Sequence, residues 1–228
     1  MARTAFVAAL LAFSLVPFYW MLVASLKRGD NQLTIGNPWW FDGFYLGGYT
    51  GLFDDTLFRG WMINTLAVLV LTVLISVTAS ALAAYALTFL EVPYSRSLVL
   101  VFFATYLLPQ GVLFLPLVRE MAWLHLLNSP AALVAVFPSL VIPFGTWVLW
   151  SFFRSVPREL IDLARLEGAT PRTLLLGILA PMAGPALAAV GLFAVAIGFN
   201  DFIHSFTLIQ TQPDPTPKAG SGPLRTPL

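Results

Sequence analysis

The sequence predicts an all-α protein that crosses a membrane several times as a polytopic bundle of helices. Three observations lead to this fold class: 58% of the 228 residues are hydrophobic, only 10% are charged, and the apolar residues gather in five long stretches. A soluble domain carries roughly 25% charged residues, and a water-soluble core of this size could not hold the excess of apolar side chains. Helices are expected because lipid offers no hydrogen-bond partner to an open backbone.

The five stretches are long and apolar enough to cross the roughly 30 Å hydrocarbon core of a bilayer as helices. They are residues 5 to 26, 61 to 90, 98 to 118, 131 to 153 and 178 to 207. The first stretch follows Arg3 and could be read as a signal peptide. It nevertheless continues to Leu26 and ends in FYWMLVASLK, without the small-residue cleavage site of a signal peptide. We therefore expect a retained first span.

The connecting segments are polar or aromatic. Residues 27 to 60 are rich in glycine and aromatic side chains, which suits the membrane–water interface; a lid packed over the spans is the alternative. Residues 91 to 97 and 119 to 130 form shorter connectors. Residues 211 to 228 contain five prolines and no periodic apolar face, so we expect a disordered tail after one membrane domain over residues 1 to 210.

The charges and side chains exclude several function classes. A formal net charge of +1 gives no argument for binding nucleic acid, and the absence of cysteine excludes disulfides and thiolate metal sites. His125 and His204 lie far apart in the sequence, so we interpret them as packed or interfacial rather than as metal ligands. No GxxxxGK[ST] phosphate-binding loop occurs, so any ATP hydrolysis must come from a partner.

With the N-terminus in the cytoplasm, six basic residues flanking the spans would lie inside and four outside. This excess favours that orientation, because positive residues gather on the cytoplasmic side. Lys218 and Arg225 in the tail would level that count, because five spans place the tail on the opposite side.

The most charged segment, residues 158 to 181, reads RELIDLARLEGATPRTLLLGILAP. Pro157 suits the first turn of a helix, and acidic residues near its N-terminus and Arg165 near its C-terminus match the helix dipole. Arg158 and Asp162 are four apart, so their side chains could meet on one face. The predicted apolar stripe on another face consists of Leu160, Leu163 and Ala164.

A sharp turn is expected to follow this short helix. Gly168 can adopt a positive φ and end the helix, while Thr170 can cap a second helix that begins at Pro171. The resulting bent knob fits either a groove on a partner protein or the lipid headgroups. Membrane-surface helices carry mainly basic residues on the polar face, whereas Glu159, Asp162 and Glu167 nearly balance the arginines here. The charge balance favours a protein partner.

This segment resembles the EAA loop of bacterial ABC-importer permeases, whose pattern is E-A-A, three residues, G, nine residues and I-x-L-P. Asp162, Leu163 and Ala164 stand in the E-A-A places, Gly168 follows after three residues, and the pattern closes at Pro181. The spacing is kept throughout. The sequence departs from the pattern at Asp162 and Leu163, and at Ala180 where the pattern has leucine.

Other segments resemble the carbohydrate-uptake, maltose-type branch of this family, among them WMINTL from residue 61, AAYALTFLEVPYSRS from 83 and GFNDFIHSFTLI from 198. The resemblance covers nearly all of residues 5 to 210 and implies the type I importer permease fold in the bacterial plasma (inner) membrane. It also implies three protein partners: an ATP-binding subunit that holds ATP and Mg²⁺, a second permease subunit and an extracytoplasmic solute-binding protein. The chain itself would need no cofactor and would catalyse no reaction.

The resemblance implies that the loop over residues 155 to 181 couples the permease to the ATPase. The coupling residues would be Glu159, Asp162, Leu163, Ala164, Glu167, Gly168, Ala169 and Pro181. In the spans, neutral hydroxyls and amides suit a polyhydroxyl solute, although helix packing explains the serines and threonines equally well. Gln110, Asn200 and Asp201 are the candidates for the solute pathway, because larger polar groups are costlier to leave unpaired.

Two alternatives stay open. Permeases of this branch have a sixth span after the NDF region, whereas the composition here changes abruptly after Gln210. A truncated or frameshifted copy that does not transport, or a natural short variant, would explain this change. A membrane-embedded enzyme is the alternative from another class, but it needs a cluster of aspartates or histidines on one face, which the sequence lacks.

Overall fold

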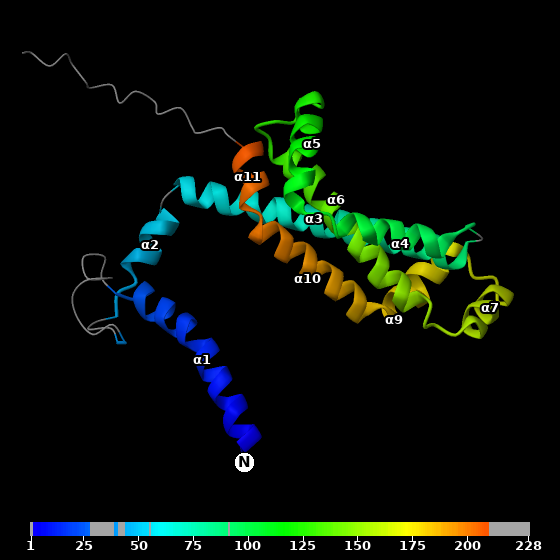
Figure 1. Ribbon diagram of the computed structural model, residues 1–228, viewed down its shortest axis with the longest axis horizontal. Coiled ribbons are helices and arrows are strands. Elements are labelled where there is room, and N and C mark those ends of the chain that lie inside the picture. Colours follow the sequence, from blue (N-terminus) through cyan, green and yellow to red (C-terminus); the bar gives the residue numbers. More distant parts are fainter. Residues whose placement is uncertain (1, 28–38, 41–43, 55, 91, 210–228) are drawn as a thin grey trace, which may run out of the picture. The chain divides into compact units, whose positions relative to one another are not determined.

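The computed structural model describes residues 2–27, 39–40, 44–54, 56–90 and 92–209, and every regular element in these residues is a helix (Figure 1). Three helices are long and apolar enough to cross a membrane, and two bent helix pairs bring the number of candidate spans to five. The predicted class, an all-α membrane protein of about five spans, is therefore confirmed. The proline-rich segment 211–228 lies outside the described residues, so its predicted disorder stays a prediction.

The chain divides into two compact units, Met1–Asn64 and Thr65–Leu228. The first contains α1 (Ala2–Ser25), α2 (Gly47–Asp54) and the first turns of α3 (Thr56–Phe89). Nearly every described side chain of α1 is exposed, as expected for a helix that lipid surrounds. The expected connector over residues 27 to 60 falls partly outside the described residues; within it, Trp39 and Trp40 are exposed, and the structure adds α2.

Hydrogen bonds tie the described part of this connector to the end of α1. The Tyr19 hydroxyl donates to the Trp39 carbonyl at 2.7 Å, and the Tyr49 hydroxyl donates to Ser25 Oγ at 2.6 Å. Polar ends of amphipathic aromatic side chains commonly find such partners where apolar and aqueous surroundings meet.

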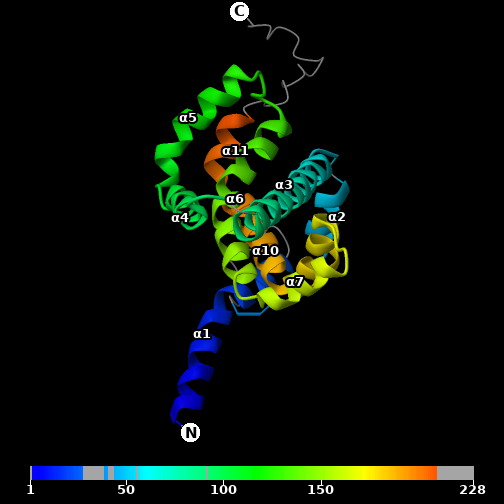
Figure 2. The same cartoon turned by 90° about the vertical axis from the view of Figure 1, so that its right-hand side faces the viewer.

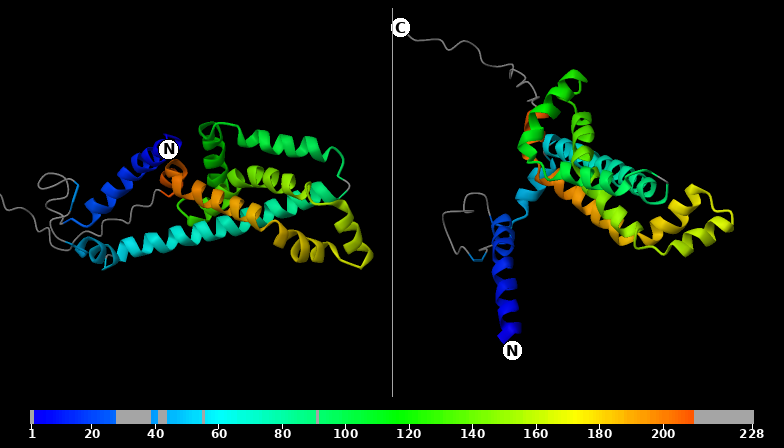
Figure 3. Two further views of the ribbon diagram at one scale, coloured as in Figure 1. Left: turned by 90° about the horizontal axis from the view of Figure 1, so that it is seen from below. Right: turned by 45° about the vertical axis from the view of Figure 1, so that its right-hand side comes forward.

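The second unit is built around α6 (Pro130–Phe153), which packs against α4 (Ser95–Tyr106) and α10 (Gly184–Asn200). Half of the α6 residues are buried, because neighbours cover several of its faces. The short α11 (Phe202–Leu208) packs against α5 (Gln110–Trp123) and α6. The views agree that α5 and α11 lie at one end of this unit and α7 (Arg158–Leu166) at the other (Figure 2, Figure 3).

Two of the expected spans are broken rather than continuous. Residues 98 to 118 divide into α4 and α5, which are bent by 94° around Leu107–Pro109. Residues 178 to 207 begin in η2 (Leu174–Leu179), which lies between α8 (Pro171–Thr173) and α9 (Ala180–Met182). An 81° bend separates these three segments from α10. Prolines lie beside both bends, where a missing N–H and a restricted preceding residue interrupt the helix. The expectation of helix throughout these two stretches is wrong for that reason.

Candidate functional site

The short α7 helix comes directly after α6 and carries most of the charged segment. It begins at Arg158, and Pro157 is the residue before the helix, whereas the sequence predicted this proline within the first turn. Glu159 lies in the first turn and Arg165 in the last, so both charges favour the helix dipole as expected.

A glycine turn ends α7. Gly168 has a φ of +85°, and its N–H donates to the Arg165 carbonyl at 3.0 Å, while the Ala169 N–H donates to the Ala164 carbonyl at 2.9 Å. This pair of bonds is the Schellman motif, which satisfies two carbonyls that the helix end leaves open. A residue with a Cβ would be strained at this φ. The predicted glycine stop is confirmed.

The next helical segment starts as the sequence predicts. Thr170 Oγ1 accepts a hydrogen bond from the Thr173 N–H at 3.2 Å, and Pro171 takes the first helical position. The following segment, η2, was not expected: it is a π-helix, in which Leu174 and Leu179 are buried. Pro181 lies just after it and has no N–H to continue a regular hydrogen-bond ladder. Single-turn π segments are frequent at functional sites.

The two faces of α7 have different surroundings. Ile161 and Ala164, three residues apart, are 3% and 8% exposed and belong to the main core cluster, against which Ala169 also packs. In contrast, Leu163 and Leu166 are 59% and 86% exposed. The predicted stripe of Leu160, Leu163 and Ala164 is therefore wrong, because Ala164 faces the core and the two leucines do not. Ile161 was not among the predicted residues, although its spacing from Ala164 is typical of a buried helix face.

The charged side chains of α7, including Glu159 and Asp162, are exposed, and so is Glu167 at its C-cap. Within the described residues, the ion pair that the structure contains joins Asp201 and His204. Arg158 and Asp162, whose side chains could meet on one face, form no ion pair there. Arg165 instead donates to the Phe89 carbonyl at 3.4 Å and so links α7 to the end of α3.

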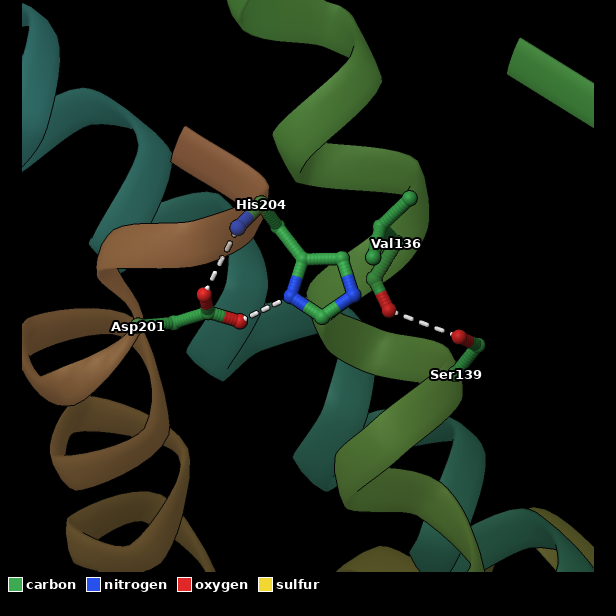
Figure 4. Close-up of polar contacts among 4 residues, drawn as sticks. All are labelled: Val136, Ser139, Asp201 and His204. Carbon is green, nitrogen blue, oxygen red and sulfur yellow. Dashed lines mark hydrogen bonds and ion pairs between the residues drawn. The ribbon is translucent and has the colours of Figure 1, made fainter. Parts of the chain in front are cut away.

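The candidate pathway residues belong to the ends of α5, α10 and α11, away from α7. Figure 4 shows the surroundings of one of them, Asp201. One carboxylate oxygen of Asp201 accepts from the His204 N–H at 2.9 Å, and the other bonds to Nδ1 of the His204 ring. Asp201 therefore caps α11, while the amide of Asn200 donates to the Ala196 carbonyl at 2.8 Å. Gln110 begins α5, and its side chain lies outside the described residues.

His204 is packed, as expected: it is 2% exposed and meets the Phe114 ring edge-to-face at 5.4 Å. The hydroxyls considered for the pathway divide between exposed and buried positions, and those of Thr65, Thr78, Thr105 and Ser139 are exposed. Thr72, Ser76 and Ser80 on α3 and Thr146 on α6 are all buried, which agrees with a packing role.

These features define a multi-pass, all-helical membrane protein with a short, half-exposed helix between two of its spans. The same fold occurs in the solved structure of a bacterial ABC transporter involved in the import of the acidic polysaccharide alginate. That similarity has a TM-score of 0.80 at 20% sequence identity and covers 92% of this chain and 74% of that chain. No family model matches the sequence.

Sequence similarity to named transport proteins shows the family to which this chain belongs. The chain is 32% identical over 195 residues to the sulfoquinovosyl glycerol transport system permease protein SmoH of Agrobacterium fabrum, covering 85% of this chain and 68% of that protein. It is 28% identical over 204 residues to the trehalose transport system permease protein SugB of Mycobacterium tuberculosis, covering 88% and 72%. The maltodextrin transport system permease protein MdxG of Bacillus subtilis is 26% identical, covering 87% and 72%.

The chain therefore belongs to the permease proteins of carbohydrate ABC transporters, a family of non-catalytic, multi-pass membrane subunits. The resemblance found in the sequence is confirmed.

Proposed function

We propose that this permease forms, together with a second permease subunit, the pathway for a sugar or related polyhydroxyl solute across the bacterial plasma (inner) membrane. An extracytoplasmic binding protein delivers the solute, and a separate ATP-binding subunit holds ATP and Mg²⁺. The relatives named for trehalose, maltodextrin and sulfoquinovosyl glycerol transport support the solute class. The scarcity of charge in the spans argues against ion-coupled transport, and the hydroxyls and amides of the spans suit a polyhydroxyl solute.

In this proposal α7 is the coupling helix, which seats in a cleft of the ATP-binding subunit. The observation that carries the proposal is the division of α7 into an anchored face and an open face. Ile161 and Ala164 fix the helix to the core, while Leu160, Leu163 and Leu166 are 38%, 59% and 86% exposed. Burying a leucine fully is worth about 1.5–3 kcal/mol, so a cleft that covers these side chains gains substantial binding energy.

The acidic residues of this segment orient the contact with the ATP-binding subunit. Glu159, Asp162 and Glu167 are exposed on α7 or its C-cap, where basic groups of a partner cleft can reach them. The Schellman turn at Gly168 then joins α7 to the segment that leads through Pro181 into α10. Because Ala164 and Ala169 pack on the same core as α6 and α10, a displacement of α7 is passed to the spans.

The solute pathway is proposed to include Gln110, Asn200 and Asp201. The helical structure is interrupted at Asp201, between α10 and α11. It is also interrupted at Pro109, the residue just before Gln110 and the start of α5. Interrupted helices at membrane depth are tolerated where the backbone is packed in protein or lines a polar cavity. Asn200 is exposed in the isolated chain, so its amide is open to a second permease or to solute.

Site-specific cross-linking tests the assignment of α7. The chain has no cysteine, so Glu167→Cys gives a single-cysteine permease. We expect a bifunctional thiol–amine reagent in intact cells to link this position to the ATP-binding subunit, because Glu167 is exposed at the end of α7.

The matched control is Trp123→Cys. Trp123 is 79% exposed at the end of α5, which precedes the start of α6, whereas α7 comes after the end of α6. We expect no ATPase to be captured from this position. Failure to capture the ATP-binding subunit from Glu167→Cys, with both proteins present at normal levels, would remove α7 from the coupling role.

A further inference from the structure

A hollow of about 440 Å³ opens on the inner side of α7, where several helices of the second unit end. Its walls are the last turn of α3, the first turn of α4, the last turn of α6 and α7 itself. The lining residues that carry charge are Arg96, Arg154, Arg158, Arg165 and Asp162.

The charge in this hollow is strongly positive. Four arginines line it, from three different parts of the chain, and the carboxylate of Asp162 is the acidic group among the lining residues. No ion pair within the described part of the chain neutralises these arginines. The remaining polar lining is neutral, since it consists of Ser95 on α4 and Thr88 on α3, whose hydroxyl donates to the Ala84 carbonyl at 2.7 Å.

The floor of the hollow consists of apolar side chains that are packed in the core. Trp150, Phe153, Val156 and Ile161 are at most 9% exposed, so the arginines stand over a surface of low polarity. Low-dielectric walls concentrate the field of like charges and attract counter-ions. Arg154 is already held in place, with its guanidinium 4.8 Å from the centre of the Trp150 ring.

We infer that this hollow binds a phosphate-bearing anion and that an acidic phospholipid headgroup supplies it. Guanidinium groups bind phosphate through paired hydrogen bonds, and basic pockets between the ends of membrane helices bind acidic headgroups. The position favours lipid over a protein partner, because two candidate membrane spans, α3 and α6, both end here. The open leucines of α7, Leu163 and Leu166, do not line the hollow. A free organic phosphate shares the chemistry, so the test separates the two sources.

The test uses the full chain, purified in a neutral detergent and titrated with single lipids by native mass spectrometry. Phosphatidylglycerol supplies an acidic headgroup, phosphatidylcholine is the zwitterionic comparison, and glycerol 1-phosphate is the soluble competitor. We expect phosphatidylglycerol to bind more tightly than phosphatidylcholine. If glycerol 1-phosphate competes at concentrations similar to those of the lipid, the hollow binds phosphate but its ligand is a soluble molecule, and the assignment to lipid is overturned. If glycerol 1-phosphate fails to compete, the lipid is supported as the ligand.

Three variants locate the binding. Arg96→Gln combined with Arg158→Gln removes two charges, one from α4 and one from α7, and we expect roughly a thirtyfold loss of phosphatidylglycerol affinity. Arg172→Gln is the matched control, because Arg172 is exposed nearby on α8 but does not line the hollow. Asp162→Asn removes the acidic group and should strengthen binding about fivefold. A gain of affinity cannot come from a damaged fold.

Equal affinity for the two lipids, or unchanged phosphatidylglycerol binding in the double arginine variant, would overturn the inference. The same holds if the double variant loses the ATP-binding subunit and keeps its lipid, since the hollow would then be a protein contact. The lipid titrations need no ATP-binding subunit, so their outcome stands whether or not α7 couples to an ATPase.

Discussion

At the scale of single residues, Gly168 combines a φ of +85° with open space, because a Cβ built there would meet nothing within 4 Å. A side chain is therefore opposed by backbone strain, which costs roughly 1–2 kcal/mol in the left-handed region. A large cation would also project from the proposed contact with the ATP-binding subunit. The position is thus sensitive to substitution without being part of the packed core.

We predict that Gly168→Arg inserts in the membrane normally but uncouples ATP hydrolysis from transport. Reconstituted complexes would be assayed for solute uptake and for ATP hydrolysis, with membrane fractionation as the check on insertion. Gly177→Ala is the matched control, since its Cβ would lie 3.7 Å from Thr173 Cγ2, an ordinary contact. Uptake at the normal ratio to hydrolysis in Gly168→Arg would refute the role of this turn.

Some of these residues could be identified from sequence and others could not. Gly168, Thr170 and Pro171 were predictable because caps and glycine turns depend on the backbone within a few residues. Ile161 was not, since the face of α7 that turns inward is decided by the core cluster, which contains residues distant from α7 in sequence such as Ala84 and Val190. Asp201 was predicted as a pathway residue from its polarity alone, and its capping bond to α11 appears only in the structure.

At the scale of elements, α7 presents two apolar faces with different expected consequences. Leu163 is 59% exposed, so Leu163→Ser should leave the free energy of unfolding within about 0.5 kcal/mol of its original value. The same variant should weaken the complex with the ATP-binding subunit, which would be measured by co-purification. Ile161→Ser is the matched variant: it places a hydroxyl in the core and should cost about 2–5 kcal/mol of stability. Full retention of the ATPase by Leu163→Ser would count against α7 as the docking helix.

The helix bends show which features of the fold composition alone can predict and which it cannot. The apolar stretches correctly indicated where helices lie, because hydropathy reports burial in lipid or protein. Hydropathy does not report direction, so the 94° and 81° bends were not foreseen. Pro109 and Pro181 were visible in the sequence, but a proline is compatible with a kink, a helix start or a break. The neighbours that α4, α5 and α10 pack against decide among these outcomes.

At the scale of the whole second unit, α3, α6 and α10 meet around one glycine. A Cβ on Gly145 of α6 would lie 2.5 Å from Ser80 Oγ on α3 and 2.8 Å from Val190 Cγ1 on α10. Ser80 and Val190 are both fully buried, so neither has free space to move into. Helices in membranes associate through such close packing of small residues, because lipid gives no hydrophobic driving force between them. The three spans are consequently held at a distance that only glycine allows.

We therefore predict that Gly145→Ala lowers the stability of the whole unit by about 1–3 kcal/mol through overpacking. The measurement is the midpoint of thermal unfolding in detergent, followed by tryptophan fluorescence and by loss of the monodisperse peak. Gly191→Ala on α10 is the control, because its Cβ would meet Val73 and Val77 at 3.7 and 3.9 Å, which is normal contact. Adding Ser80→Ala to Gly145→Ala should recover part of the loss, since it removes the nearest atom. If Gly145→Ala were as stable as Gly191→Ala, the three helices would not be packed at this distance.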